Sequence, residues 1–151
     1  MTFVANSQPA IGTKLYLGNG VTTPVSFTLI ANVGELSGPS FASTIVDVTS
    51  HSTGTPWREK VTTLLDPGTI SLPLYFLPNV SSGGGHDFTS GLGSVFTSRS
   101  QRNYQMTFPD IYETTWIFSG FLSKFSLTAK VAGVLEAATD LTFTGEPIQI
   151  E

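Results

Sequence analysis

The chain contains no cysteine among its 151 residues, which excludes disulfide bridges and thiolate metal sites. Charged residues make up 12% of the chain, about half of the usual share in a globular domain. The net charge is −4 and no basic run occurs, so the basic patch that grips nucleic-acid phosphates is missing. No apolar run is long enough to cross a membrane, and the N-terminus shows no pattern of a signal peptide.

Residues that carry chemistry are equally scarce. The two histidines, His51 and His86, stand far apart and without a carboxylate cluster, so we expect no metal site. His86 precedes Asp87, and such a pair could orient a base for a serine nucleophile in a hydrolase. Adjacent side chains rarely face each other, so the simpler interpretation is an Asp that caps a helix beside an exposed His. We therefore predict no catalytic residue and no cofactor.

The residues that are abundant favour β-strands. The stretch FLSKFSLTAKV, residues 121–131, alternates between an apolar set that includes Phe121, Phe125 and Leu127 and a polar set that includes Lys124 and Lys130. A period of two predicts a strand with one buried and one exposed face. Further strands are predicted around residues 13–17, 26–33, 41–50, 102–110, 114–121 and 138–150.

Residues 57–76 fit two interpretations. Trp57, Val61, Leu64 and Leu65 have helical spacing, but β-branched residues and an Asp66-Pro67-Gly68 turn favour strands. We therefore predict a β-hairpin that folds back at this turn and continues through the alternating segment Thr69–Phe76. Loops are predicted at residues 51–56 and 78–87.

One helix is predicted after the second loop. Phe88, Leu92, Val95 and Phe96 recur at the spacing of one helix face, with Asp87 or Thr89 as the cap. The fold class that follows is mainly β: a β-sandwich or rolled barrel with one short α-helix packed against it, in a single domain over residues 1–151. The 11 phenylalanines leave open a soluble β-barrel that binds a ligand, although core packing is the commoner use of such residues.

The order of several short motifs along the chain resembles the tail tube, or major tail, proteins of long-tailed bacteriophages. The matching segments are Ile45–Thr49, Leu65–Leu72, Asp87, Phe108–Asp110, Phe118–Phe121 and Thr144–Pro147. The resemblance implies a structural virion protein without catalysis, whose copies form hexameric rings that stack into a hollow tube for genome delivery. A tube protein of the type VI secretion kind is the alternative with a similar fold.

The resemblance also implies the partners and the place of assembly. The partners are other copies of the chain and the tail terminator, tape measure and tail tip proteins, while DNA passes through the bore without specific binding and no membrane is involved. Assembly would take place in the host cytoplasm, and the product would be part of the virion.

The resemblance further implies that the polar loop after the third strand reaches an adjacent ring. The candidate contacts between rings are Ser50, His51, Ser52, Thr53, Thr55, Trp57, Arg58 and Glu59. Trp57 would be the anchor, and the charged pair beside it would form ion pairs across the boundary. We expect Lys124 and Lys130 to face the tube exterior or a neighbouring subunit, and acidic and hydroxyl side chains from other strands to dominate the bore.

Overall fold

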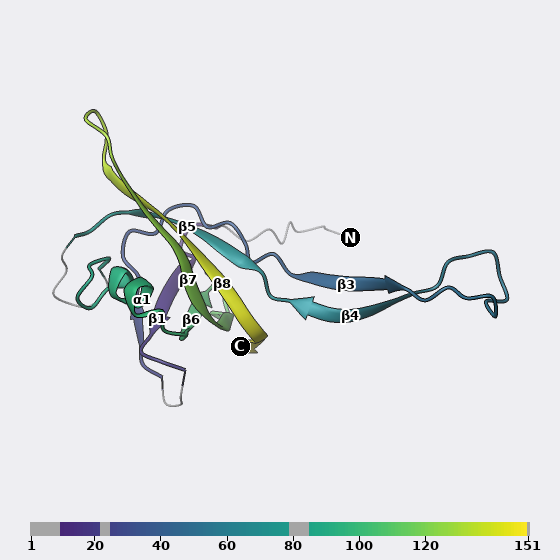
Figure 1. The fold of residues 1–151 in the computed structure, drawn as a ribbon. Helices are drawn as coiled ribbons and strands as arrows, with labels where there is room; N and C mark the ends of the chain where they lie inside the picture. Colours follow the sequence, from purple (N-terminus) through teal and green to yellow (C-terminus); the bar gives the residue numbers. More distant parts are fainter. Residues whose placement is uncertain (1–9, 22–24, 79–84, 151) are drawn as a thin grey trace, which may run out of the picture.

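A six-stranded antiparallel sheet is the body of the molecule, and a two-stranded ribbon projects from it (Figure 1). The structure, a computed structural model, describes residues 10–21, 25–78 and 85–150. The sheet has the order β2-β1-β6-β7-β8-β5, and β3 pairs with β4 in the ribbon. The strands are β1 (Lys14–Gly18), β2 (Phe27–Leu29), β3 (Ala42–Asp47), β4 (Lys60–Asp66), β5 (Thr69–Tyr75), β6 (Arg102–Thr107), β7 (Thr115–Ala129) and β8 (Leu135–Ile150).

The core lies on one face of the six-stranded sheet. Alternate residues of every long strand point into it, among them the fully buried Leu15, Leu72 and Leu141. The short helix α1 (Leu92–Ser98) covers this face with Leu92 and Val95, and Ile30 adds to it from the segment after β2. The predicted fold class, mainly β with one short helix packed against the sheet, is confirmed. The described strands form an open, sandwich-like arrangement rather than a closed barrel.

The helix begins four residues later than predicted. Asp87 accepts hydrogen bonds from the backbone N–H groups of Thr89 and Ser90 at 3.1 and 2.9 Å, which holds residues 87–90 in a turn instead of a first helical turn. Gly91 approaches the carbonyl of Gly85 so closely that a Cβ would lie 2.4 Å from that oxygen. Phe88 is consequently 58% exposed and lies outside the buried helix face on which it was predicted.

Two strand predictions needed correction. The predicted hairpin over residues 57–76 is wrong in its pairing, because β4 pairs with β3 and β5 pairs with β8. Gly68, at φ +79°, packs directly against Ser40, so the turn leads the chain out of the ribbon and into the sheet. The strand predicted over 26–33 shortens to β2, since Asn32 adopts a left-handed conformation at φ 53°. The predicted loop over 78–87 lies mostly outside the described residues.

The alternation of residues 121–131 is interrupted by a β-bulge. Leu122 pairs with Leu141 and Lys124 with Asp140, so Ser123 is an extra residue in β7. Its hydroxyl donates to the carbonyl of Asp140 at 3.0 Å. Because the extra residue exchanges the buried and the exposed face of β7 at this point, one alternating set cannot stay buried along the whole strand. Leu122 is buried although it was predicted to be exposed, whereas Phe121 is 40% exposed.

Candidate assembly surfaces

The ribbon of β3 and β4 has no core of its own. Every residue of both strands is exposed, although the strands carry large apolar side chains. Leu64 and Leu65 are 72% and 79% exposed, and Ile45 is 61% exposed. In Figure 1 the ribbon extends away from the sheet, and no other described segment runs along its sides. A surface of this kind on a single chain marks a site of protein contact.

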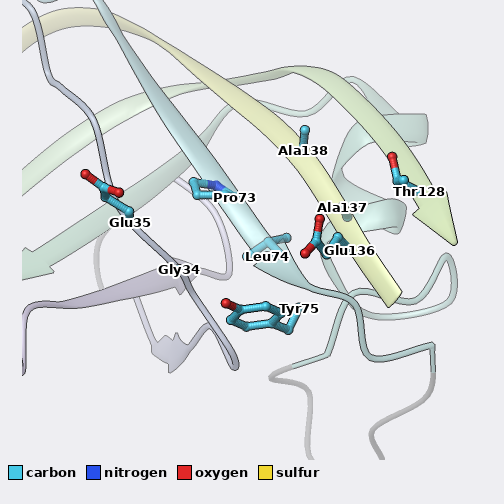
Figure 2. A pocket seen from close by; sticks show the side chains of 9 residues that line it. All are labelled: Gly34, Glu35, Pro73, Leu74, Tyr75, Thr128, Glu136, Ala137 and Ala138. Carbon is cyan, nitrogen blue, oxygen red and sulfur yellow. The ribbon is translucent and has the colours of Figure 1, made fainter. Parts of the chain in front are cut away.

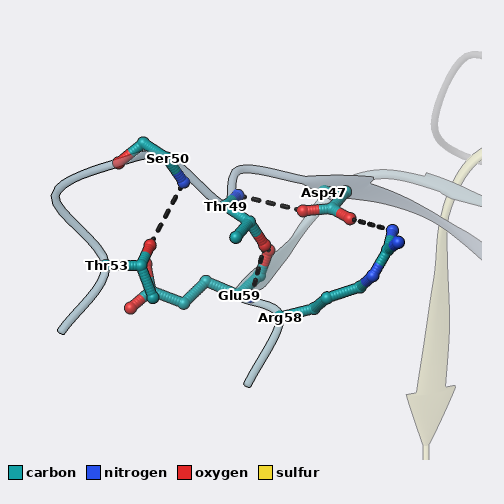
Figure 3. A network of polar contacts seen from close by, with 6 residues as sticks. All are labelled: Asp47, Thr49, Ser50, Thr53, Arg58 and Glu59. Atoms are coloured by element: carbon teal, nitrogen blue, oxygen red, sulfur yellow. Dashed lines mark hydrogen bonds and ion pairs between the residues drawn. The ribbon is translucent and has the colours of Figure 1, made fainter. Parts of the chain in front are cut away.

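The end of the ribbon is closed by a network of polar contacts (Figure 3). Glu59 donates its backbone N–H to the hydroxyl of Thr49 at 2.8 Å, and Arg58 forms an ion pair with Asp47 at 3.0 Å. Hydrogen bonds, first from Thr49 and then from Arg58, hold the pKa of Asp47 below its usual value. These contacts connect the two strands of the ribbon where they end, next to the loop.

The residues predicted to contact another ring all lie in or beside this loop. Ser50 and Thr53 exchange two hydrogen bonds, from Thr53 N to Ser50 O at 3.0 Å and from Ser50 N to Thr53 Oγ1 at 3.1 Å. Thr53 is half-buried by this turn, and the others are exposed: Ser50, His51, Ser52, Thr55, Trp57, Arg58 and Glu59. Trp57 is 78% exposed. The structure therefore brings the predicted residues together at one end of the ribbon.

The sides of the ribbon were not among the predicted contacts. Val46, Val61 and Leu64 are exposed there, as the loop residues are. The sequence pattern indicates these sides, because apolar residues occur on both faces of the third and fourth predicted strands. A two-sided apolar strand in a chain of this length requires cover on both faces.

A second surface is the open edge of β7. Strand β6 pairs with β7 only over residues 115–120, so residues 121–129 have no partner on that side in the described part of the chain. On the other side these residues pair with β8. An unpaired strand edge exposes backbone donors and acceptors that can form a ladder with a strand from another chain.

The sheet face opposite the core is rich in hydroxyl groups. Gln101 donates to the hydroxyl of Ser119 at 2.6 Å, and Thr142 donates to that of Ser123 at 3.0 Å. Lys124 is paired with Asp140 in the register, so both side chains lie on this face. Lys130 lies 3.9 Å from Glu136 in an exposed ion pair. The face therefore combines hydroxyl groups and charges of both signs with the exposed ring of Phe121.

Two hollows lie on the surface of the described residues. The one in Figure 2 measures about 330 Å³ and lies where β5 meets β8, with Glu35, Tyr75 and Glu136 around it. A larger hollow of about 730 Å³ lies at the base of the ribbon, between Phe41, Leu65 and Pro147. Both are open to solvent. Among the described residues no group of acidic, histidine or cysteine side chains could hold a metal ion, and no helix is long and apolar enough to cross a membrane.

The two histidines occupy opposite environments. His51 is exposed in the loop of the ribbon, whereas His86 is fully buried and has hydrogen bonds at both ring nitrogens. The expectation that His86 is an exposed neighbour of a capping Asp is therefore wrong. Loop composition around His86 suggested exposure, but the ring packs beside Phe76 with its centroid 6.0 Å away.

Comparison with known proteins identifies the fold through structure alone. No family model and no curated protein matches the sequence. A chain from the tail of an empty gene transfer agent particle, refined with C6 symmetry, has a TM-score of 0.68 at 18% identity. The match covers 91% of this chain and 96% of the other.

Two further solved structures have the same fold. A chain from the sheath/tube terminator of PVC, an extracellular contractile injection system, has a TM-score of 0.70 at 12% identity, over 99% of this chain and 100% of the other. The SPP1 tail tube has a TM-score of 0.63 at 11% identity, over 93% and 78%. The fold that the sequence resemblance implied is therefore the fold of this chain.

Proposed function

We propose that the chain is the structural subunit of a phage tail tube and that it assembles into stacked hexameric rings around a bore for DNA. The observation that carries this proposal is the ribbon of β3 and β4, whose apolar side chains have no cover within the described part of the subunit. Burying one Leu or Val side chain contributes about 1.5–3 kcal/mol. A neighbouring subunit that covers Ile45, Leu64 and Leu65 together would thus stabilise the interface between the two subunits by several kcal/mol.

The loop of the ribbon supplies the contact between rings in this proposal. The described loop has no hydrogen bond from Gly54 to Trp57, and Trp57 presents its indole to solvent. Large aromatic side chains in this position are typical anchors of protein interfaces. Arg58 and Glu59 add charged groups beside the anchor, which favour one orientation of the neighbouring ring.

The open edge of β7 supplies the contact within a ring. A strand of the neighbouring subunit would complete the ladder along residues 121–129 and remove the exposed edge. Lys124 and Lys130 would then face this neighbour or the tube exterior, and hydroxyl and acidic side chains from strands other than β7 would dominate the bore. A surface with few cations holds DNA weakly, which suits a channel through which DNA passes.

The neighbouring structures support the location and the symmetry. One comes from a tail with C6 symmetry, and another from a tube terminating cap of the anti-feeding prophage. The subunit would therefore belong to the virion and meet tail terminator, tape measure and tail tip proteins, after assembly in the host cytoplasm. The likeness to the PVC chain favours a second candidate function, the tube of a contractile injection system.

The direct test is electron microscopy of the purified protein over a range of concentrations. Rings or hollow rods with sixfold symmetry are expected at high concentration. Small, uniform particles at every concentration would contradict self-assembly. Packaging of DNA in particles that contain the protein would then separate a phage tail from an injection system, because only the former delivers a genome.

A further inference from the structure

His86 joins three segments that are distant in sequence. Its Nδ1 accepts a hydrogen bond from the backbone N–H of Leu77 at 3.0 Å, just beyond the end of β5. Its Nε2 lies 2.9 Å from the carbonyl oxygen of Ala31, in the connection after β2. Because Nδ1 accepts, the proton of the neutral ring is on Nε2, and Nε2 donates to Ala31. The neutral ring therefore satisfies both backbone groups.

A second proton cannot be accommodated in this arrangement. Protonation would place an N–H on Nδ1, directly opposite the N–H of Leu77, and two donors would then face each other. The imidazole is fully buried, and its partners Ala31 and Leu77 are half-buried. A buried charge with an unsatisfied amide beside it is strongly unfavourable. The geometry thus allows the neutral ring and excludes the charged one.

We propose that His86 is an acid-sensitive joint, whose protonation separates the end of β5 and the residue 31 connection from the segment that leads into α1. One further backbone bond, from His86 N to Leu77 O at 3.2 Å, joins the segment to the end of β5, and a bond from Leu92 N to Gly85 O at 3.3 Å lies within the segment itself. Opening the joint would release this segment as a unit.

The electrostatic surroundings agree with this direction. Burial lowers the pKa of His86, while the hydrogen bond to Ala31 and the charge of Asp87 oppose the change and only partly offset it. Asp87 has a lowered pKa, chiefly because Ser90 donates its N–H to it, and it stays charged between pH 5.5 and 7.5. Ala31, Phe76 and Leu77 contribute only backbone groups and apolar side chains to the joint.

The joint is connected to the open edge of β7. Phe76, beside the imidazole, packs edge-to-face against Phe125 of β7 with ring centroids 6.1 Å apart. Phe88 and Phe96, from the segment that the joint holds, pack against the same ring, with ring centroids 5.6 and 6.4 Å from that of Phe125. If the edge of β7 joins subunits, opening the joint at acid pH would disturb this aromatic cluster and weaken assembly. This consequence rests on the proposed function.

Thermal melts of the unassembled protein at pH 7.5 and 5.5 test the joint. A group with a lowered folded pKa stabilises the fold above its unfolded pKa of about 6.5 and loses this contribution as the pH falls toward the folded pKa. The folding equilibrium constant of the wild type should thus decrease by up to about tenfold per pH unit in that range. His86→Gln keeps a donor and an acceptor but cannot be protonated, so its melting temperature should change much less.

The exposed histidine provides the matched control. His51→Gln should show the same acid dependence as the wild type. An equal decrease in His86→Gln and the wild type would overturn the proposal. If His86→Gln does not fold, NMR titration of the His86 ring in the wild type decides the question. Its pKa should lie below the usual value for histidine, and a pKa at or above that value would overturn the proposal. Because the protein is unassembled, failure here leaves the tube function untouched.

Discussion

Strands β4 and β5 follow each other directly in the chain but have opposite relations to solvent. In β5, Ile70, Leu72 and Leu74 are buried while the residues between them are exposed or half-buried. In β4 every residue is exposed, including Leu64 and Leu65. Both segments are rich in apolar residues and both form strands. Strand β5 is therefore stabilised by its own subunit, whereas the described part of the chain leaves the apolar side chains of β4 uncovered, as expected if a neighbouring subunit covers them in the proposed tube.

The largest effect is expected from Leu72→Ala in β5. Removing a fully buried Leu side chain leaves a cavity and should cost about 2–5 kcal/mol of stability. Thermal unfolding of the monomer should therefore occur several degrees lower. An unchanged melting temperature would mean that β5 is not part of the core.

Leu65→Ala is the matched substitution in β4, since it removes the same atoms at a residue that is 79% exposed. The stability of the monomer should change by less than about 0.5 kcal/mol, as at other surface positions. Tube formation, followed by light scattering and microscopy, should be strongly reduced. A variant that is destabilised as much as Leu72→Ala would remove the distinction between the two strands.

Shortening the loop by deleting Ser52–Thr55 sharpens the comparison further. The deletion removes no large apolar side chain, so the monomer should melt at nearly the same temperature. Ordering a loop costs about 1–2 kcal/mol per residue in backbone entropy, and contacts with another ring would have to offset this cost. Tubes should fail to elongate. Full-length tubes built from the shortened variant would refute the role of the loop in stacking.

Arg58→Ala should have the smallest effect on the monomer. The ion pair with Asp47 is exposed, and pairs of this kind contribute little to stability because water and salt screen them. Melting curves of the monomer should overlay those of the wild type. Any effect should appear in the assembly assay, where Arg58 would contact the neighbouring ring. A clear loss of monomer stability would show that the pair holds the ribbon together.

Local patterns were sufficient to predict most strands and the helix, because alternation and helical spacing depend on near neighbours. The pairing of β4 with β3 was not predictable from the turn at Gly68, since contact with Ser40 decides the direction of the chain. The bulge at Ser123 was likewise hidden, because it depends on the register against β8.

The candidate site was partly predictable. The polar loop at residues 50–56 was recognised from its composition and the resemblance. The exposure of Leu64 and Leu65 was not predictable, because apolar residues are usually buried in the core and only the fold shows that these two are uncovered. His86 was wrongly predicted to be exposed, because its partners, Ala31 and Leu77, come from segments that only the fold brings together.

Hydrogen–deuterium exchange on the monomer and on assembled tubes tests the central claim most directly. The amides of β3 and β4 should exchange rapidly in the monomer and become strongly protected in tubes, because neighbouring subunits cover the ribbon. The amides of β5 should be protected to a similar degree in both states. Equal exchange of β3 and β4 in monomer and tube would contradict the claim that the ribbon is an interface between subunits.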